Sequence, residues 1–341
     1  MLPLALLLSL LLAAAPHVAV LSTSKGVTEL RFQPLGDAAL APVAASFSHE
    51  AGSTVRAGSL PGRPVVLAVA ALEHHPDASF GASLVRLEAG QPPRVLTTGL
   101  ALASAPAISA GGRVFVQRGR AGPVLLPGLF RVDALRIDEV NPETGALSLL
   151  YASEGSFAYV AGFFGNELLV YEAGAAGARL LGIELDSRVV RVLRASLPPL
   201  AHDFAVDEAG KRLLYTLGAP GSDGWSVVET RLDVPASRVL GTGDRVALLP
   251  TVLPDGRVLI SAGPGRGLVD LATGEVVLPA QGEGFERVRF FWQGLAIGLH
   301  ETPSSFPVPF VLSLPTAARL AQTSRLAAVP DARLELAGVG P

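Results

Sequence analysis

The chain of 341 residues contains no cysteine, and this absence removes several classes of chemistry. Disulfide scaffolds, thiolate zinc sites, iron–sulfur clusters and cysteine nucleophiles are all excluded. A lipoprotein is excluded as well, because no cysteine is present to carry the lipid. The net charge is only −3, and just two of the 27 basic residues are lysines, Lys25 and Lys211. This balance gives no electrostatic reason to expect nucleic acid binding.

Charged residues are also missing from the start of the chain. No Asp, Glu, Lys or Arg precedes Lys25, and residues 4–15 form an apolar block, LALLLSLLLAAA. This length and composition are typical of a secretory signal peptide. We therefore expect a signal peptide over residues 1–20 and a periplasmic or secreted protein.

The cleavage point remains open from the sequence. Ala13 and Ala15 fit an A-x-A pattern, but Pro16 would follow that cut, which is unfavourable, so cleavage nearer Ala19 is the second option. An uncleaved anchor is the alternative to cleavage, since residues 2–21 would just span a bilayer.

The remainder of the chain is rich in apolar residues, glycine and proline. Apolar residues make up 49% of the sequence, with 37 Gly and 27 Pro that follow no three-residue period. These features exclude a disordered chain and a collagen-like chain. After residue 25 no apolar run approaches 18 residues, so we expect no transmembrane segment there and a single globular domain over residues 25–341.

One pattern recurs six times: a short apolar strand, a Gly-centred turn and a strongly apolar strand. A second pair of shorter strands follows each copy, and alternation with Val, Leu and Phe favours strands over helices. Four strands in roughly 40–50 residues are typical of a β-propeller blade. The sequence therefore predicts an all-β fold, a six-bladed β-propeller with four-stranded antiparallel blades. The six turn glycines are Gly62, Gly112, Gly165, Gly210, Gly256 and Gly294.

The two ends of the domain provide further strand-like segments, at residues 27–35 and 332–339. They could form a seventh, degenerate blade. The favoured interpretation is that they pair with each other or with a terminal blade and help to close the ring, which covers an exposed sheet edge.

Two copies of the repeat carry a family resemblance. AVDEAGKRLLYTL (205–217) and TVLPDGRVLISAG (251–263) resemble the repeat of TolB-type bacterial propellers, which run D-x-x-G-K/R into an apolar strand. GLVDLATGEVV (267–277) resembles their third strand and its D-x-x-T-G turn. The aromatic residue and the Ser-Pro that precede that family's turn are absent, so the resemblance is one of architecture. It implies a family that includes periplasmic protein-binding scaffolds and the propellers of some peptidases, and it fixes no single function.

Loops on one face of the predicted propeller are the candidate binding surface. Connections between the second and third strands of a blade emerge on one face, and four of these are long. Aromatic and Arg side chains are favoured at binding surfaces, and loops on a rigid scaffold commonly carry function. The predicted ligand-binding residues on this rim are Arg118, Phe130, Arg131, Trp225, His300 and Phe306.

Catalytic motifs are scarce. His74, His75 and Asp77 share the loop EHHPDASFG and could together hold a metal ion, although a solvated loop is the favoured interpretation. No G-x-S-x-G elbow, H-E-x-x-H pair or Walker lysine occurs, so we predict no catalysis and no cofactor.

The sequence thus favours an exported, monomeric binding or scaffold module that recognises a protein, a cell-envelope partner or a small ligand. One alternative is a hydrolase or lyase with a His/Asp metal or polar site at the mouth of the propeller channel. Another is a structural envelope protein without a small ligand.

Overall fold

The computed structural model describes residues 16–341 except 38, 75–80, 102–103, 127–128, 154–156, 175–176, 200, 219–223, 244–247, 262–264, 266, 281–283, 293, 302–306, 314–322, 325 and 341. The side chains of residues 120–135, 157, 248–249 and 323–324 are likewise outside the described part. Every regular element in the described residues is a β-strand.

The two ends of the chain share one antiparallel sheet. Its order is β28 (Arg333–Gly340), β1 (His17–Ser24), β2 (Val27–Pro34) and β3 (Ala45–Ser48). β28 and β1 pair over almost their whole lengths, from His17 opposite Gly340 to Thr23 opposite Arg333. Because the last strand is joined to the first, the ring closes through hydrogen bonds between the chain ends.

The next sheet has eight strands and divides into two consecutive meanders. The first runs β4 (Arg56–Ser59), β5 (Val65–Ala70), β6 (Ala82–Glu88) and β7 (Arg94–Leu100), and the second runs β8 (Ala107–Ile108), β9 (Val114–Leu126), β10 (Leu129–Val140) and β11 (Leu147–Ser153). A single pairing, Leu100 with Arg118, joins β7 to β9.

Four further sheets have four antiparallel strands each. The first consists of β12 (Phe157–Phe164), β13 (Glu167–Gly174), β14 (Gly177–Glu184) and β15 (Val190–Leu197), and the second of β16 (Ala201–Asp207), β17 (Arg212–Gly218), β18 (Trp225–Arg231) and β19 (Ser237–Gly243). The third consists of β20 (Leu248–Val252), β21 (Val258–Ser261), β22 (Leu268–Asp270) and β23 (Val276–Leu278). The fourth consists of β24 (Phe285–Trp292), β25 (Leu295–Glu301), β26 (Val308–Ser313) and β27 (Thr323–Ser324).

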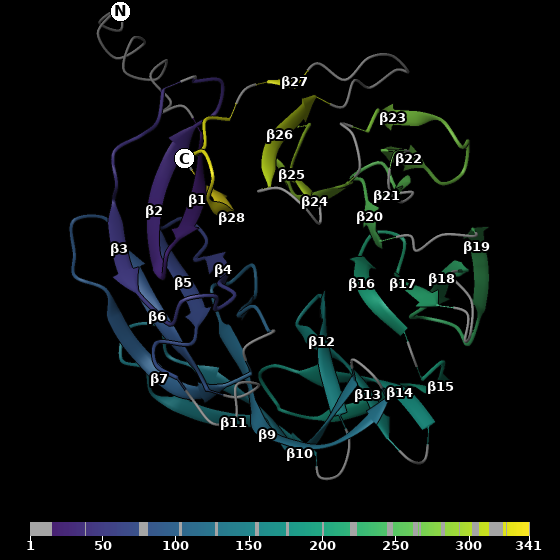
Figure 1. Ribbon diagram of the computed structural model, residues 1–341. Helices are drawn as coiled ribbons and strands as arrows, with labels where there is room; N and C mark the ends of the chain where they lie inside the picture. The colour runs from purple at the N-terminus through teal and green to yellow at the C-terminus, as the bar shows by residue number, and fades with distance from the viewer. Residues whose placement is uncertain are drawn as a thin grey trace, which may run out of the picture.

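These sheets stand around a central axis, so the predicted all-β propeller with four-stranded antiparallel blades is confirmed (Figure 1). The six-blade count is not confirmed, because the described strands divide into seven four-stranded units. The additional unit is the one made by the chain ends, the alternative that the sequence left open. The segments 27–35 and 332–339 do share that unit, but β1 lies between them. Part of β1 comes from residues 17–20, which the sequence assigned to the signal peptide.

Side chains packed between neighbouring units form the core. All six side chains of β5 are buried, as is almost all of β13, because both faces of these strands lie against other sheets. The fourth strands are more exposed, and β15 carries exposed Val190 and Val192. Within the described residues no helix is long and apolar enough to cross a membrane.

The turn glycines behave as predicted in five of the six copies. Gly62, Gly112, Gly165, Gly256 and Gly294 all have positive φ, a conformation that favours glycine. In the remaining copy Gly210 does not, and Lys211 takes the left-handed conformation with φ 49°. There the Asp207 carboxylate accepts a hydrogen bond from the Gly210 N–H at 2.8 Å, which holds the turn.

Candidate functional site

The side chains of the described rim residues mostly contact other parts of the protein. Arg118 lies 3.4 Å from Asp138, a fully buried carboxylate that Arg136 also contacts at 3.0 Å. Two guanidinium groups therefore compensate the burial of one carboxylate. About a third of the Arg118 side chain remains exposed.

Trp225 is buried at the start of β18, with 8% of its surface exposed. Its ring packs with Leu214 and Val258 and lies directly over Gly243, where an added Cβ would come within 2.4 Å of the indole. The ring therefore belongs to the core between two units, and its predicted role in binding stays a prediction.

His300 forms a buried pair with Glu286 across β24 and β25. The His300 Nδ1 atom lies 3.0 Å from the Glu286 carboxylate, and the two residues are 5% and 2% exposed. His300 Nε2 and Glu286 Oε2 are buried and have no hydrogen-bond partner in the described part of the chain. Glu286 thus orients the imidazole from one side.

Of the remaining predicted site residues, only His74 has a side chain in the described part of the structure. His74 is exposed and lies 3.0 Å from Glu50, whereas His75, Asp77 and Phe306 fall outside the described residues. The side chains of Phe130 and Arg131 fall outside them as well. In the described part, no three His, Asp or Glu side chains gather closely enough to hold a metal ion.

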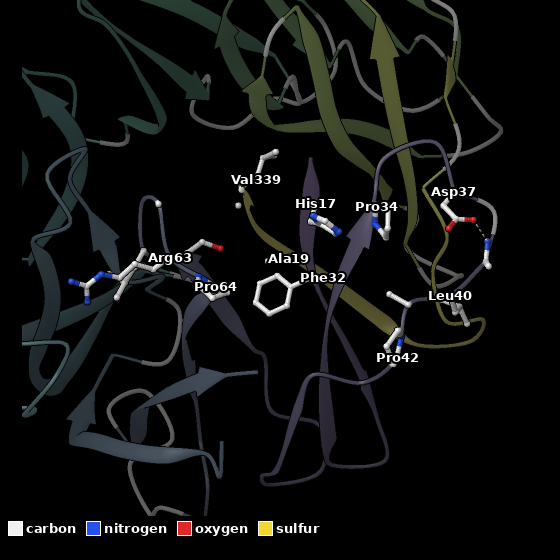
Figure 2. Close-up of a pocket in the computed structure, with 17 residues that line it drawn as sticks. His17, Ala19, Phe32, Pro34, Asp37, Leu40, Pro42, Arg63, Pro64 and Val339 are labelled. Atoms are coloured by element: carbon white, nitrogen blue, oxygen red, sulfur yellow. Dashed lines mark hydrogen bonds between the residues drawn. The ribbon is translucent and has the colours of Figure 1, made fainter. Parts of the chain in front are cut away.

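A pocket that the sequence did not reveal lies at the seam where the ring closes, between the end-made unit and the unit of β4–β7. This seam pocket has a volume of about 650 Å³. Figure 2 shows the Phe32 ring in its middle with His17 beside it, Pro64 and Arg63 to one side and Leu40 and Pro42 to the other. Its lining residues are His17, Ala19, Phe32, Pro34, Asp37, Ala39, Leu40, Ala41, Pro42, Ser59, Leu60, Gly62, Arg63, Pro64, Gly338, Val339 and Gly340.

One wall of the seam pocket is the loop between β2 and β3, and Gln33 fixes it. The Gln33 side chain, fully buried, donates to the Ala39 carbonyl at 2.8 Å and accepts from the Ala41 N–H at 2.9 Å. Arg31 donates to the Ala41 carbonyl at 3.1 Å. These bonds satisfy backbone groups of the loop at Ala39 and Ala41, so the chain itself fixes this wall.

Few polar groups interrupt the apolar lining. Ser59, a lining residue, has a buried Oγ atom with no hydrogen-bond partner among the described residues. Arg63 lies at the edge, more than half exposed, and pairs with Glu143 at 2.7 Å. The Asp37 carboxylate is occupied by the Ala39 N–H at 2.9 Å.

No protein-family model matches the sequence, and no curated protein matches it. Solved structures do resemble the fold. The periplasmic gluconolactonase PpgL of Pseudomonas aeruginosa is 15% identical with a TM-score of 0.61, over 95% of this chain and 99% of that one. A protein from Lactobacillus plantarum is 12% identical with a TM-score of 0.56, over 95% of this chain and all of that one.

TolB from Acinetobacter baumannii is a third similar structure, at 11% identity and a TM-score of 0.47. The match covers 79% of this chain, which spans 65% of that TolB chain. The likeness to these propellers is at the level of architecture, as the repeat predicted. Propellers serve both binding proteins and enzymes, so the fold alone does not separate binding from catalysis.

Proposed function

We propose that the protein is an exported binding module that holds a small, predominantly apolar ligand in the seam pocket. The observation that carries this proposal is the pocket itself: about 650 Å³, mostly apolar, with one wall fixed by hydrogen bonds from Gln33. Small-molecule sites are typically concave, mostly apolar and of roughly 300–1,000 Å³, with a few polar groups that fix orientation.

The lining indicates the class of ligand. Phe32, Leu60 and Val339 offer flat and branched apolar surface, and burial of apolar ligand area there is favourable by about 25 cal/mol per Å². Polar groups contribute little, since Ser59 Oγ is buried and Arg63 lies at the edge of the pocket. A compact, predominantly apolar ring or short-chain compound fits this arrangement best.

A neutral probe tests the proposal. N-phenyl-1-naphthylamine is apolar, uncharged and fluorescent when removed from water, so charged groups elsewhere on the protein do not attract it. We expect saturable binding of about one probe per chain, followed by fluorescence titration.

The blocking variant is Gly340→Leu. Gly340 lines the pocket, has no positive φ, and has no atom within 4 Å of an added Cβ, so a larger side chain enters open space. Gly218→Leu, equally unobstructed but in β17, is the matched control. Probe binding should be lost in Gly340→Leu and kept in Gly218→Leu. Equal binding by both variants, or no saturable binding by the wild type, would refute the proposal.

Export and rim contacts are further parts of this proposal. The apolar block at residues 4–15 supports passage across the inner membrane. Arg118, with a third of its side chain exposed, supports contact with a protein partner on the rim. Crosslinking from position 118 in periplasmic extract, compared with position 257 on the opposite turns, tests this contact.

A further inference from the structure

Two arginines meet at one buried carboxylate at the inner edge of the ring, and a third arginine lies beside them. Arg289 of β24 donates to Glu335 of β28, and Arg56 of β4 lies 3.6 Å from the same carboxylate. Arg287, two residues before Arg289, reaches only Glu301, at 3.8 Å. The strands β24, β28 and β4 stand next to one another around the central space (Figure 1).

The charges in this arginine cluster do not balance. Arg56, Arg287 and Arg289 bring three positive charges, and Glu335 and Glu301 bring two negative charges. Burial lowers the pKa of Arg289, and the charges of Arg287 and Arg56 lower it further against the opposing effect of Glu335. The guanidinium groups therefore repel one another in a poorly solvated place, an arrangement that an added anion would relieve.

The cluster is accessible to a small solute. The side chains of Arg56, Arg287 and Arg289 are 33%, 23% and 19% exposed, whereas Glu335 beneath them is 7% exposed. The pairs made by Arg56 and Arg287 are long, at 3.6 and 3.8 Å, so these two forks keep donors free for another acceptor. Guanidinium forks match the oxygen spacing of carboxylates and phosphates.

We propose that Arg56, Arg287 and Arg289 form a binding site for a small anion that carries a phosphoryl or carboxylate group. The site is separate from the seam pocket. The anion would bind in the central space of the ring, where arginines from two inner strands, β4 and β24, contact it together. Glu335 offsets part of the positive charge of the arginines.

Calorimetric titration with inorganic phosphate and with citrate, at constant ionic strength and pH 7, tests the site. We expect saturable binding of at least one of them, and the preferred probe distinguishes a phosphoryl from a carboxylate ligand. Arg287→Gln and Arg56→Gln should each weaken that binding about tenfold or more, since each removes a charge-assisted hydrogen bond. Arg257→Gln, which removes an exposed arginine paired with Asp255 in another unit, should leave it unchanged.

A second variant keeps the test decisive if an arginine substitution affects folding. Glu335→Gln removes a negative charge from the site while keeping its shape, so anion affinity should rise. Absence of binding by the folded wild type, equal affinity in Arg287→Gln and Arg257→Gln, or weaker binding by Glu335→Gln would each overturn the proposal.

Discussion

Gly338 in β28 allows the last strand to lie close to β4 across the seam. An added Cβ at this position would come within 2.7 Å of both Cβ and Oγ of Ser59. Cβ atoms normally keep at least 3.4 Å from such neighbours, and the Ser59 Cβ cannot rotate away. Gly338→Ala should therefore force β28 and β4 apart by several tenths of an ångström.

The cost of this separation follows from overpacking. Extra methyl groups in close-packed regions typically destabilise a protein by about 1–3 kcal/mol. For a chain of this length that corresponds to a fall in Tm of roughly 1.5–4 °C. Gly340→Ala, two residues further along β28, meets nothing within 4 Å and should be neutral or slightly stabilising. Both substitutions restrict the unfolded chain equally, so the difference between them isolates the contact with Ser59.

Thermal and urea unfolding of the two variants, with Ser59→Gly added to each, measure the effect. Ser59→Gly removes the obstructing atoms and should restore most of the stability lost in Gly338→Ala, with an interaction of more than about 0.5 kcal/mol in the double-mutant cycle. If Gly338→Ala and Gly340→Ala unfold alike, or if Ser59→Gly gives no rescue, then β28 does not pack against β4 as described.

Three further predictions address the pocket wall, the pH response and the chain start. Gln33→Ala should weaken N-phenyl-1-naphthylamine binding more than it lowers Tm, because it releases the loop wall at Ala39 and Ala41; unchanged affinity would refute this. Burial raises the pKa of Tyr171 to about 12, so its stabilising effect is complete below pH 10 and is lost as the pH rises toward 12. Tyr171→Phe should therefore show a smaller loss of unfolding free energy over that interval, and an unchanged profile would contradict it. The exported protein should begin no later than His17, since Val18 and Val20 are buried in β1; intact-mass measurement showing a start after His17 would refute this.

Much of the fold was predictable because it depends on local patterns. Gly-centred turns such as those at Gly112 and Gly256 fix hairpins, and alternating apolar residues fix which strands are buried. The blade count was less accessible, because no hairpin joins β28 to β1 in the unit made by the chain ends. β28 and β1 pair across more than 300 residues of sequence, and no local signal marks such a pairing.

The predicted rim residues show the limit of placing side chains from loop positions. His300 and Trp225 were assigned to loops, but they lie at the end of β25 and the start of β18. There the alternation of the strand, rather than the loop, sets the direction of each side chain. His300 consequently lies opposite Glu286, and Trp225 packs over Gly243. Which positions face each other across two strands depends on register, and bulges in several inner strands shift that register.

The seam pocket follows from how the ring is closed. In the other units a short hairpin joins the inner strand to the second strand, whereas here His17 and Gly340 pair with no connection between them. The turns between third and fourth strands are five or six residues long in five of the other units, at 89–93, 141–146, 185–189, 232–236 and 271–275, whereas the β2–β3 loop spans 35–44. The missing hairpin between β28 and β1 and the long β2–β3 loop lie at the same end of the unit that the chain ends form. The seam pocket therefore lies beside the joint that hydrogen bonds make between the two ends of the chain, and a ligand bound there would contact both ends. Such a ligand would stabilise the closed ring by RT ln(1 + [L]/Kd), which couples binding at the seam to the stability of the whole fold.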